Sequence, residues 1–346
     1  MSSSNLIQIK AFLGKYYPEL EYYVAQDKYV KAGLNKFFEQ RFIIQSNKTQ
    51  MIVDPHLNGL AAIFSGNEIQ VSQNLYDHPF INIVNSMEKQ DTLASNPKSL
   101  YTPEVFSTMA YLICQNHTML EIVGEIEEPV YIKYKSDFET FYNSVVVVNI
   151  AEGIDVEIVE EFESHCAINA VTNYILQADA RLNLTTFYNN NLSAMSFYLR
   201  NVILQETAKY SHILFGKGSS NVVDESKISA NDNSKVELLG CINPGSQEFH
   251  AIVGLMPVTQ NYDFIIDHRN VIIGSGKSTF TPVVFGHLPV DAYTNISSII
   301  LDQFSPEFRN EKANEFLGEI LDRATLERLV GVSRFYANKS KFLQFQ

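Results

Sequence analysis

The sequence predicts a mainly β protein built around a β-helix, and two observations carry this prediction. A polar turn followed by an alternating strand recurs through the middle of the chain, with Ile154, Ala180, Ala208 and Ser234 at equivalent points and steps of 26, 28 and 26 residues. Such constant spacing is typical of stacked structural units. The strands also follow one another without intervening helices, which excludes a doubly wound α/β fold and leaves a β-helix, a sandwich or a barrel. The constant step, with two strands per unit, favours the β-helix.

The N-terminal third predicts helices followed by a small hairpin. Apolar residues fall near helical spacing in residues 5–12 and 19–42, with Pro18 at the break. Residues 51–54 and 61–64 resemble short strands, and the turn at 65–68 leads into a third strand at 69–72, which predicts a hairpin. A further helix is expected over residues 103–115, with Phe106, Met109, Ala110 and Ile113 on one side.

From Met119 onward the hydrophobic period changes to two residues. Each of the following segments is rich in Val, Ile, Thr, Tyr or Phe and is bounded by polar turns. The predicted strands are 119–123, 130–134, 144–150, 156–162, 167–176, 182–187, 197–204, 210–215, 222–229, 236–241, 249–255, 262–266, 271–273 and 279–285.

The C-terminus predicts a return to helix. Ser305 is placed as a cap, Pro306 occupies the first helical position, and Glu307 adds an acid to the first turn. An apolar stripe follows, made of Ala313, Phe316, Leu317, Ile320, Leu321 and Ala324. The stripe fits two roles, either covering the end of the strand domain or docking another protein.

Composition limits the classes of partner and the compartment. The 346 residues carry a formal net charge of -13, which argues against non-specific binding to nucleic acid or to an anionic membrane. No apolar run approaches the roughly 20 residues that span a bilayer, and Met1 begins no charged and apolar leader, so we expect a cytoplasmic protein. Cys114, Cys166 and Cys241 are too few and too dispersed for a disulfide framework.

Several short motifs are candidates for chemistry, and each also has a structural interpretation. Residues 274–279, Gly-Ser-Gly-Lys-Ser-Thr, match the tail of a phosphate-binding loop, but a strand pattern with Pro282 follows where a helix should, which favours a glycine-rich turn. The charged group at Asp263 and residues 267–269 fits a solvated turn at the end of a strand as well as a general base.

Potential metal ligands and paired acids are the other candidates. His165 and Cys166 are the only adjacent pair of soft ligands, although Cys166 is expected to begin a strand, where neighbours face opposite ways. Cys241 is a weaker ligand candidate, because a buried small side chain explains it equally well. The paired acids at 127–128 and 160–161 leave open an alternative function, a carbohydrate-active or carbohydrate-binding β-helix protein.

The order of these segments resembles the SufB/SufD family of iron–sulfur cluster assembly scaffold proteins, and is more similar to SufD. The resemblance rests on residues 122–132, 145–160, 169–172, 180–182, 208–211, Gly240, 306–313 and 319–322, in this order. It covers roughly residues 61–329 and contains no diagnostic catalytic motif.

The resemblance implies a right-handed parallel β-helix between an N-terminal helical and mixed region and a small helical C-terminal region. We therefore predict three parts, residues 1–118, 119–303 and 304–346. The implied function is that of a non-enzymatic scaffold, paired with a SufB-like paralogue or with itself as a homodimer. The implied cofactor is at most a transient iron–sulfur cluster, with no firmly bound group.

The resemblance also implies that the C-terminal helices bind SufC, an ABC-type ATPase. The residues assigned to this contact are Ser305, Pro306, Glu307, Phe308, Arg309, Ala313, Phe316 and Leu317. Family members carry a Cys-x-His-Gly stretch before the terminal helix, whereas residues 291–301 of this chain contain neither Cys nor His. The resemblance therefore gives no cluster ligand in that segment.

Overall fold

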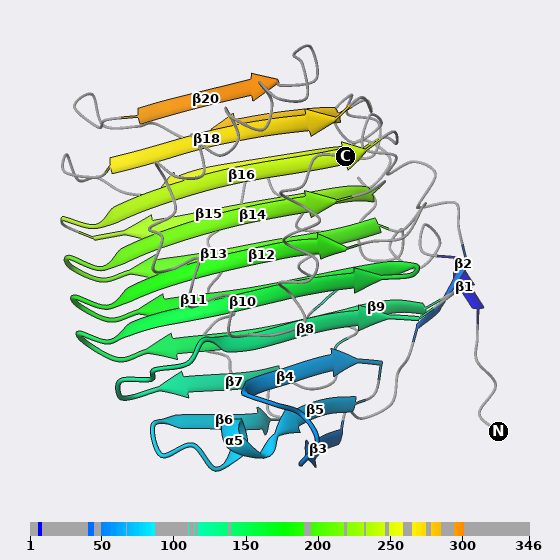
Figure 1. Ribbon diagram of the computed structural model, residues 1–346, viewed down its shortest axis with the longest axis vertical. Coiled ribbons are helices and arrows are strands. Elements are labelled where there is room, and N and C mark those ends of the chain that lie inside the picture. Colours follow the sequence, from blue (N-terminus) through cyan, green and yellow to red (C-terminus); the bar gives the residue numbers. More distant parts are fainter. Residues whose placement is uncertain are drawn as a thin grey trace.

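Two ten-stranded sheets stack against each other to form a parallel β-helix (Figure 1). The computed structural model describes residues 50–66, 68–86, 110, 114, 117–137, 140–189, 195–217, 220–231 and 233–245, and the strands at 6–8, 41–44, 249–258, 265–274, 278–284 and 294–300. Beyond Leu214, side chains are described only at 224, 226, 228, 229, 231 and 233–236.

The strands of the first sheet, sheet A, run mostly parallel to one another. They are β1 Leu6–Gln8, β2 Arg41–Ile44, β6 Ile81–Ser86, β7 His117–Ile122, β9 Thr140–Ile150, β11 Ala167–Leu176, β13 Met195–Leu204, β15 Ser220–Ala230, β17 Phe249–Val258 and β19 Ser278–Val284.

Sheet B contains the alternate strands of the same coils. They are β3 Gln50–Asp54, β4 Leu60–Ser65, β5 Glu68–Ser72, β8 Val130–Ser136, β10 Asp155–Ser164, β12 Arg181–Asn189, β14 Lys209–Lys217, β16 Lys235–Gly245, β18 Ile265–Gly274 and β20 Thr294–Ile300. One short helix, α5 Gln73–Tyr76, is described beside them. From β8 to β20 the chain alternates between the sheets, so each coil supplies one strand to each and the predicted β-helix is confirmed.

The repeated turn has a backbone conformation that explains its spacing. Gly153, Asp179, Thr207 and Asn233 all have positive φ, between 58° and 70°. Asp and Asn tolerate this left-handed conformation better than most residues, and Gly adopts it freely. The residues that follow Asp179, Thr207 and Asn233 turn inward and are buried. Each of these turns therefore directs the chain from a strand of sheet A to the next strand of sheet B at an equivalent position in every coil.

Hydrogen bonds join each turn to its neighbours in the stack. The N–H groups of Arg181, Lys209 and Lys235 donate to carbonyl oxygens one coil earlier, at 2.9, 2.9 and 3.1 Å. Amide side chains add a second set of bonds, as when Asn231 Nδ2 donates to Gln205 Oε1 at 2.8 Å. Because buried backbone groups need partners, these bonds allow the turns to stack without gaps.

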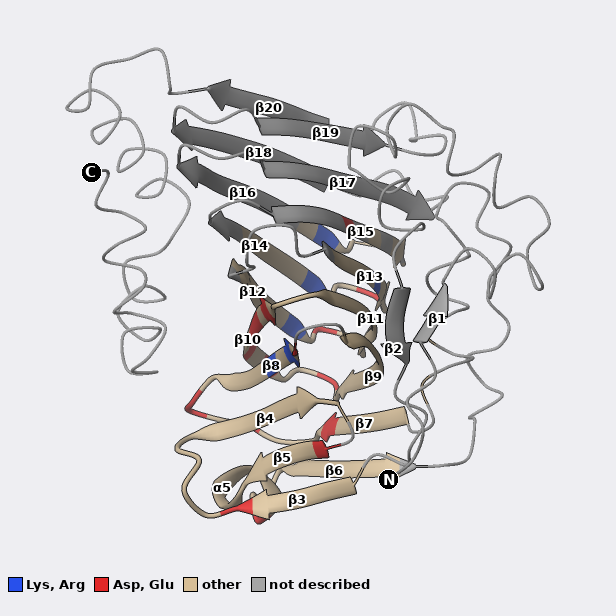
Figure 2. Cartoon of the chain, turned by 90° about the vertical axis from the view of Figure 1, so that its right-hand side faces the viewer, with Lys and Arg blue, Asp and Glu red and all other residues tan. Residues whose placement is uncertain are grey.

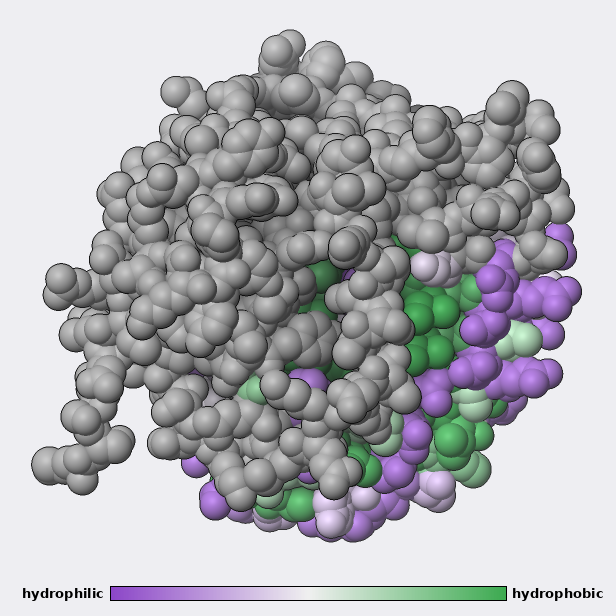
Figure 3. Space-filling model, turned by 180° about the vertical axis from the view of Figure 1, so that it is seen from behind, coloured by the Kyte–Doolittle hydropathy of each residue, from purple (hydrophilic) through white to green (hydrophobic). Residues whose placement is uncertain are grey.

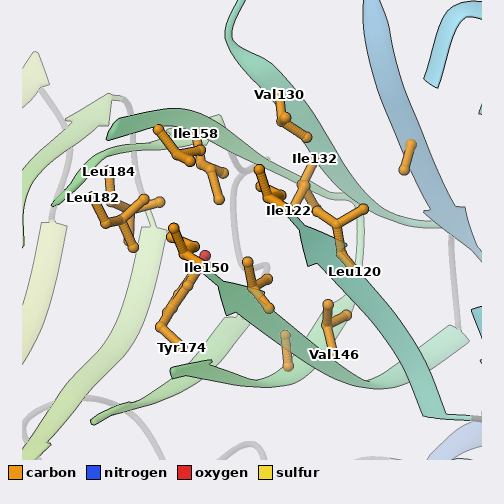
Figure 4. Close-up of a cluster of buried hydrophobic side chains, with 14 of the residues drawn as sticks. Leu120, Ile122, Val130, Ile132, Val146, Ile150, Ile158, Tyr174, Leu182 and Leu184 are labelled. Carbon is orange, nitrogen blue, oxygen red and sulfur yellow. The ribbon is translucent and has the colours of Figure 1, made fainter. Parts of the chain in front are cut away.

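The interior between the sheets is apolar near the N-terminal end. Val, Ile and Leu side chains from both sheets point toward one another there (Figure 4). Phe64, Tyr134, Phe162 and Tyr188 occupy paired positions on β4, β8, β10 and β12 and stack with ring centroids 5.4, 4.8 and 4.9 Å apart. Burial of each such side chain contributes roughly 1.5–3 kcal/mol, so this interior is the main source of stability.

Helical cover is seen on the outer face of sheet A. Ala110 is helical, Cys114 N–H donates to its carbonyl oxygen at 2.8 Å, and both pack on Val145 and Val171. This agrees with the helix predicted at 103–115. Ala110 and Cys114 are the described residues of that segment, and the rest of it lies outside the described residues. The described strands at 51–54, 61–64 and 69–72 are also as predicted, and β4 and β5 form the expected antiparallel hairpin.

Some predictions near the termini were wrong. Leu6–Gln8 and Arg41–Ile44 are strands that pair antiparallel. The first lies within the helix predicted at 5–12, and the second overlaps the end of the helix predicted at 19–42. Short apolar runs fit both the helical period and the strand period. Residues 41–44 form a strand because β2 pairs with β9. The rest of those two segments lies outside the described residues. Residues 294–300 form β20, a strand that the sequence pattern did not reveal.

In the C-terminal half of the solenoid, β18 is one strand where two were predicted. Residues 267–269 therefore lie within a strand, and the predicted turn at this place was wrong. Ser278 begins β19, so a strand rather than a helix follows residues 274–277. A phosphate-binding loop is followed by a helix, so this order does not fit one. Residues 275–277 themselves lie outside the described residues.

The positive φ of Thr207 provides a test of the turn. We expect Thr207→Gly to be more stable than Thr207→Ala by about 1 kcal/mol, because only glycine adopts this conformation without a steric cost. Both variants lose the bond from Thr207 Oγ1 to Asp179 Oδ1, so their difference isolates the backbone term. Urea unfolding followed by circular dichroism measures it. Equal stability of the two variants would show that the turn is not strained.

Candidate functional site inside the β-helix

A cluster of buried charges interrupts the apolar interior between β10 and β15. Arg200 on β13, Glu160 on β10 and Asp224 on β15 are fully buried. Arg200 Nη2 lies 3.3 Å from Glu160 Oε2, and Arg200 Nη1 donates to Asp224 Oδ1. These three residues come from both sheets, so the cluster joins the two walls of the β-helix.

Hydroxyl groups complete the coordination of Glu160. Its Oε1 accepts from Tyr174 at 2.6 Å and also from Tyr198, and its Oε2 accepts from Thr186 at 3.0 Å. With Arg200, four donors therefore reach one carboxylate. Charge-assisted bonds of this kind are stronger than bonds between neutral groups, which offsets the cost of removing the carboxylate from water.

A second group of donors surrounds Arg200 and Asp224. Tyr188 donates to Asp224 Oδ2 at 2.5 Å, and Arg200 Nη2 donates to Thr186 Oγ1 at 2.7 Å. The guanidinium carbon lies 3.8 Å from the centre of the Tyr198 ring, which is a cation–π contact. His212, also buried, has Nε2 3.1 Å from the same Thr186 oxygen. Of the three guanidinium nitrogens of Arg200, Nη1 and Nη2 have hydrogen-bond partners, and Nε has none among the described residues.

The electrostatic environment keeps Tyr174, Tyr198 and Arg200 protonated. Burial raises the pKa values of Tyr174 and Tyr198 well above their usual range, and the nearby charge of Glu160 raises them further. Burial by itself would lower the pKa of Arg200, but Asp224 and the other groups around it raise that pKa. The tyrosines therefore act as hydrogen-bond donors and the guanidinium as a fixed cation, rather than as acids or bases.

The paired acids 160 and 161 face opposite sides of sheet B. Glu160 points inward, whereas Glu161 points outward and accepts from Tyr131. Lys133 lies 3.2 Å from Glu161 and also contacts Glu163. Burial would lower the pKa of Lys133, but the two carboxylates outweigh it and raise that pKa. Each acid is therefore engaged in its own ion pair, and the two do not converge as in a glycosidase.

His165 and Cys166 lie in a bend rather than in a strand. Strand β10 ends at Ser164 and β11 begins at Ala167, so the prediction that Cys166 begins a strand was wrong. His165 Nε2 is 3.6 Å from Glu163 Oε1, and the Cys166 N–H donates to Ser136 Oγ at 3.4 Å. Among the described residues, no three His, Cys, Asp or Glu side chains gather as a metal site. The side chain of Cys241 and all of residues 305–317 lie outside the described residues.

Sequence reasoning missed the buried cluster, although one signal was present. Arg200 occupies a position of β13 that alternates with Tyr198 and Val202, both of which face the interior. A charged residue at an inward position of an alternating strand is rare unless it is paired. The partners could not be found in this way, because Glu160 and Asp224 lie far from Arg200 in the sequence.

The stacked parallel strands that hold this cluster, from β8 to β19, coincide with a known domain. Residues 132–285 match the SufBD core domain of the SUF system for FeS cluster assembly. This match spans a little under half of the chain, and it supports the resemblance to the SufB/SufD family without favouring SufD. No curated protein matches the chain. No helix in the described part of the chain is long and apolar enough to cross a membrane.

Replacing the buried arginine should destabilise the β-helix far more than replacing an exposed one. We expect Arg200→Met to lower the free energy of unfolding by about 3–5 kcal/mol, because it leaves two buried carboxylates without their cation. The matched control is Arg181→Met, which removes an exposed pair with Asp155 at 3.6 Å and should cost less than about 1 kcal/mol. Urea unfolding measures both. Similar losses in the two variants would contradict a structural role for the buried cluster.

Proposed function

We propose that this chain is a non-enzymatic scaffold subunit of a SUF-type iron–sulfur cluster assembly complex. One observation carries the proposal, which is the match of residues 132–285 to the SufBD core domain over the strands of the β-helix. A stack of strands whose interior is closed and buried is suited to presenting surfaces to other subunits. In this role the iron–sulfur cluster is a transient cargo and not a resident cofactor.

The proposal includes two contacts with other proteins. An ABC-type ATPase similar to SufC docks on the C-terminal segment that contains Ser305, Pro306, Phe308 and Phe316. A SufB-like paralogue, or a second copy of this chain, pairs with the β-helix. The order of helical signals after β20 in the sequence supports the first contact. The parallel sheets support the second, because their end strands offer unpaired backbone groups to another sheet.

Co-purification with the ATPase tests the first contact. We expect Phe316→Asp to weaken ATPase binding by at least about 30-fold, since an aromatic anchor in an interface often contributes 2 kcal/mol or more. Tyr76→Asp is a matched control, because Tyr76 is an exposed aromatic residue in α5. Titration of the tagged chain with the purified ATPase measures both. Unchanged binding by Phe316→Asp, with the control also unchanged, would rule out this docking segment.

Anaerobic reconstitution tests the handling of a cluster. After incubation of the full chain with iron and sulfide, we expect visible absorption that falls in Cys166→Ser or Cys241→Ser, because thiolates are the ligands that iron–sulfur clusters require. Cys114→Ser is the control, since Cys114 packs against Ala110 and the apolar outer face of sheet A. Absorption that is equal in all three variants would exclude both candidate ligands.

A further inference from the structure

The exposed apolar side chains gather at the N-terminal end of the β-helix. Among the described residues, the large hydrophobic side chains that are exposed are Ile52, Tyr76, Phe80, Val84 and Val123. All come from β3, α5, β6 and the segments flanking β6 and β7, at the lower end of the molecule in Figure 1. Apolar side chains also reach the surface at the lower end in Figure 3. Contiguous exposed apolar residues on a folded protein commonly mark an interaction site.

Three of these residues share one face of the β6–β7 hairpin. Phe80 and Val123 are 45% and 60% exposed, and their backbones are joined by a bond from Val123 N–H to Phe80 O of 2.9 Å. Val84, 37% exposed, lies two rows further along β6. Between them, Asn82 Nδ2 donates to Glu121 Oε2 at 3.2 Å. We call Phe80, Asn82, Val84, Glu121 and Val123 the hairpin surface.

The surface is preorganised by the strands beneath it. Ile81, Ile83, Leu120 and Ile122 alternate with the exposed residues and are buried in the interior of the β-helix. The Phe80 ring also rests on Gly124, where an added Cβ would lie 2.6 Å from Phe80 Cδ1. The apolar side chains are therefore held outward by buried neighbours, and they cannot turn inward without breaking the core.

The same face of sheet A carries a helix on the adjoining strands. Register with β9 places Glu121 and Met119 on the outer face, beside Asn149 and Val147. On that face Ala110, in a helical turn, covers Val145 and Val171, and all three are buried. Among the described residues, the outer face is thus covered at β9 and β11, half-buried at β7 and exposed at β6. A helix is the element that completes this layer.

The charge of this end selects the chemistry of the helix. The described residues from 50 to 128 contain no Lys or Arg. Their acidic residues are Asp54, Glu68, Asp77, Glu121, Glu125, Glu127 and Glu128. Beyond residue 128, the described Lys and Arg residues begin at Lys133 on β8. Figure 2 shows basic residues on strands higher in the stack. A second copy presenting the same end would bring like charges together, whereas a basic partner would be attracted.

We propose that the hairpin surface binds a basic amphipathic helix of a partner protein. Phe80 and Val84 are about 13 Å apart along the strand, at roughly 3.4 Å per residue. A helix covers that distance in about two and a half turns, so apolar residues at i and i+8 meet the two ends, and a Lys or Arg at i+4 meets Glu121. This contact is separate from the C-terminal segment proposed for the ATPase.

A pair of synthetic peptides tests this surface on the full chain. The probe is a helical peptide with Leu at i and i+8 and Lys at i+4 on one face, and the comparison is the same peptide with Glu at i+4. Fluorescence anisotropy should detect binding of the Lys peptide but not of the Glu peptide. The affinity for the Lys peptide should fall as salt is added. No binding of the Lys peptide, or equal binding of the two peptides, overturns the proposal.

Variants distinguish a specific surface from general attraction to an acidic protein. We expect Glu121→Lys to weaken binding about fivefold, because it replaces a partly exposed ion pair between Glu121 and the peptide Lys with a repulsion. Asp155→Lys reverses an exposed carboxylate on sheet B and should leave binding unchanged. Val123→Ser removes an exposed apolar group at little risk to folding and should weaken binding about threefold. Equal effects of Glu121→Lys and Asp155→Lys overturn the proposal.

Discussion

The carboxylate of Glu160 ties the two walls of this β-helix together. It lies on sheet B, and it accepts hydrogen bonds from Tyr174, Tyr198 and Arg200 on sheet A as well as from Thr186 on its own sheet. A buried charge is tolerated only when its bonding capacity is filled, so the positions of these donors depend on one another. A shift of one sheet relative to the other would leave the carboxylate or the guanidinium without partners.

This dependence explains how a repetitive fold keeps a single register. The apolar layers alone would tolerate sliding, because Val, Ile and Leu recur at the inward positions of every coil. The left-handed turn residues fix the length of each coil, and the buried ion cluster fixes one coil against its neighbours. Together they hold the strands that match the SufBD core domain as one stack.

A rigid stack also separates its surfaces from one another. The charges of the interior cluster are buried and paired with one another, so the cluster supports the fold. Acidic and apolar residues mark the N-terminal end, and mixed ion pairs such as Lys133 with Glu163 mark the side of sheet B. Partners that meet different surfaces can therefore bind the chain together, as the proposed scaffold role requires.

Local signals were sufficient to predict the coil, because each turn residue and each alternating strand acts on its own segment of the chain. The spacing of Ile154, Ala180, Ala208 and Ser234 predicted the stacking, and the strand at 167–176 was placed correctly at both ends. Which side chains meet in the interior depends on pairing between strands that are distant in the sequence. Arg200, Glu160 and Asp224 lie in separate coils, and pairing between distant strands brings them together. Pairing also made strands of Leu6–Gln8 and Arg41–Ile44, where local spacing indicated helix, because their partners lie elsewhere in the chain.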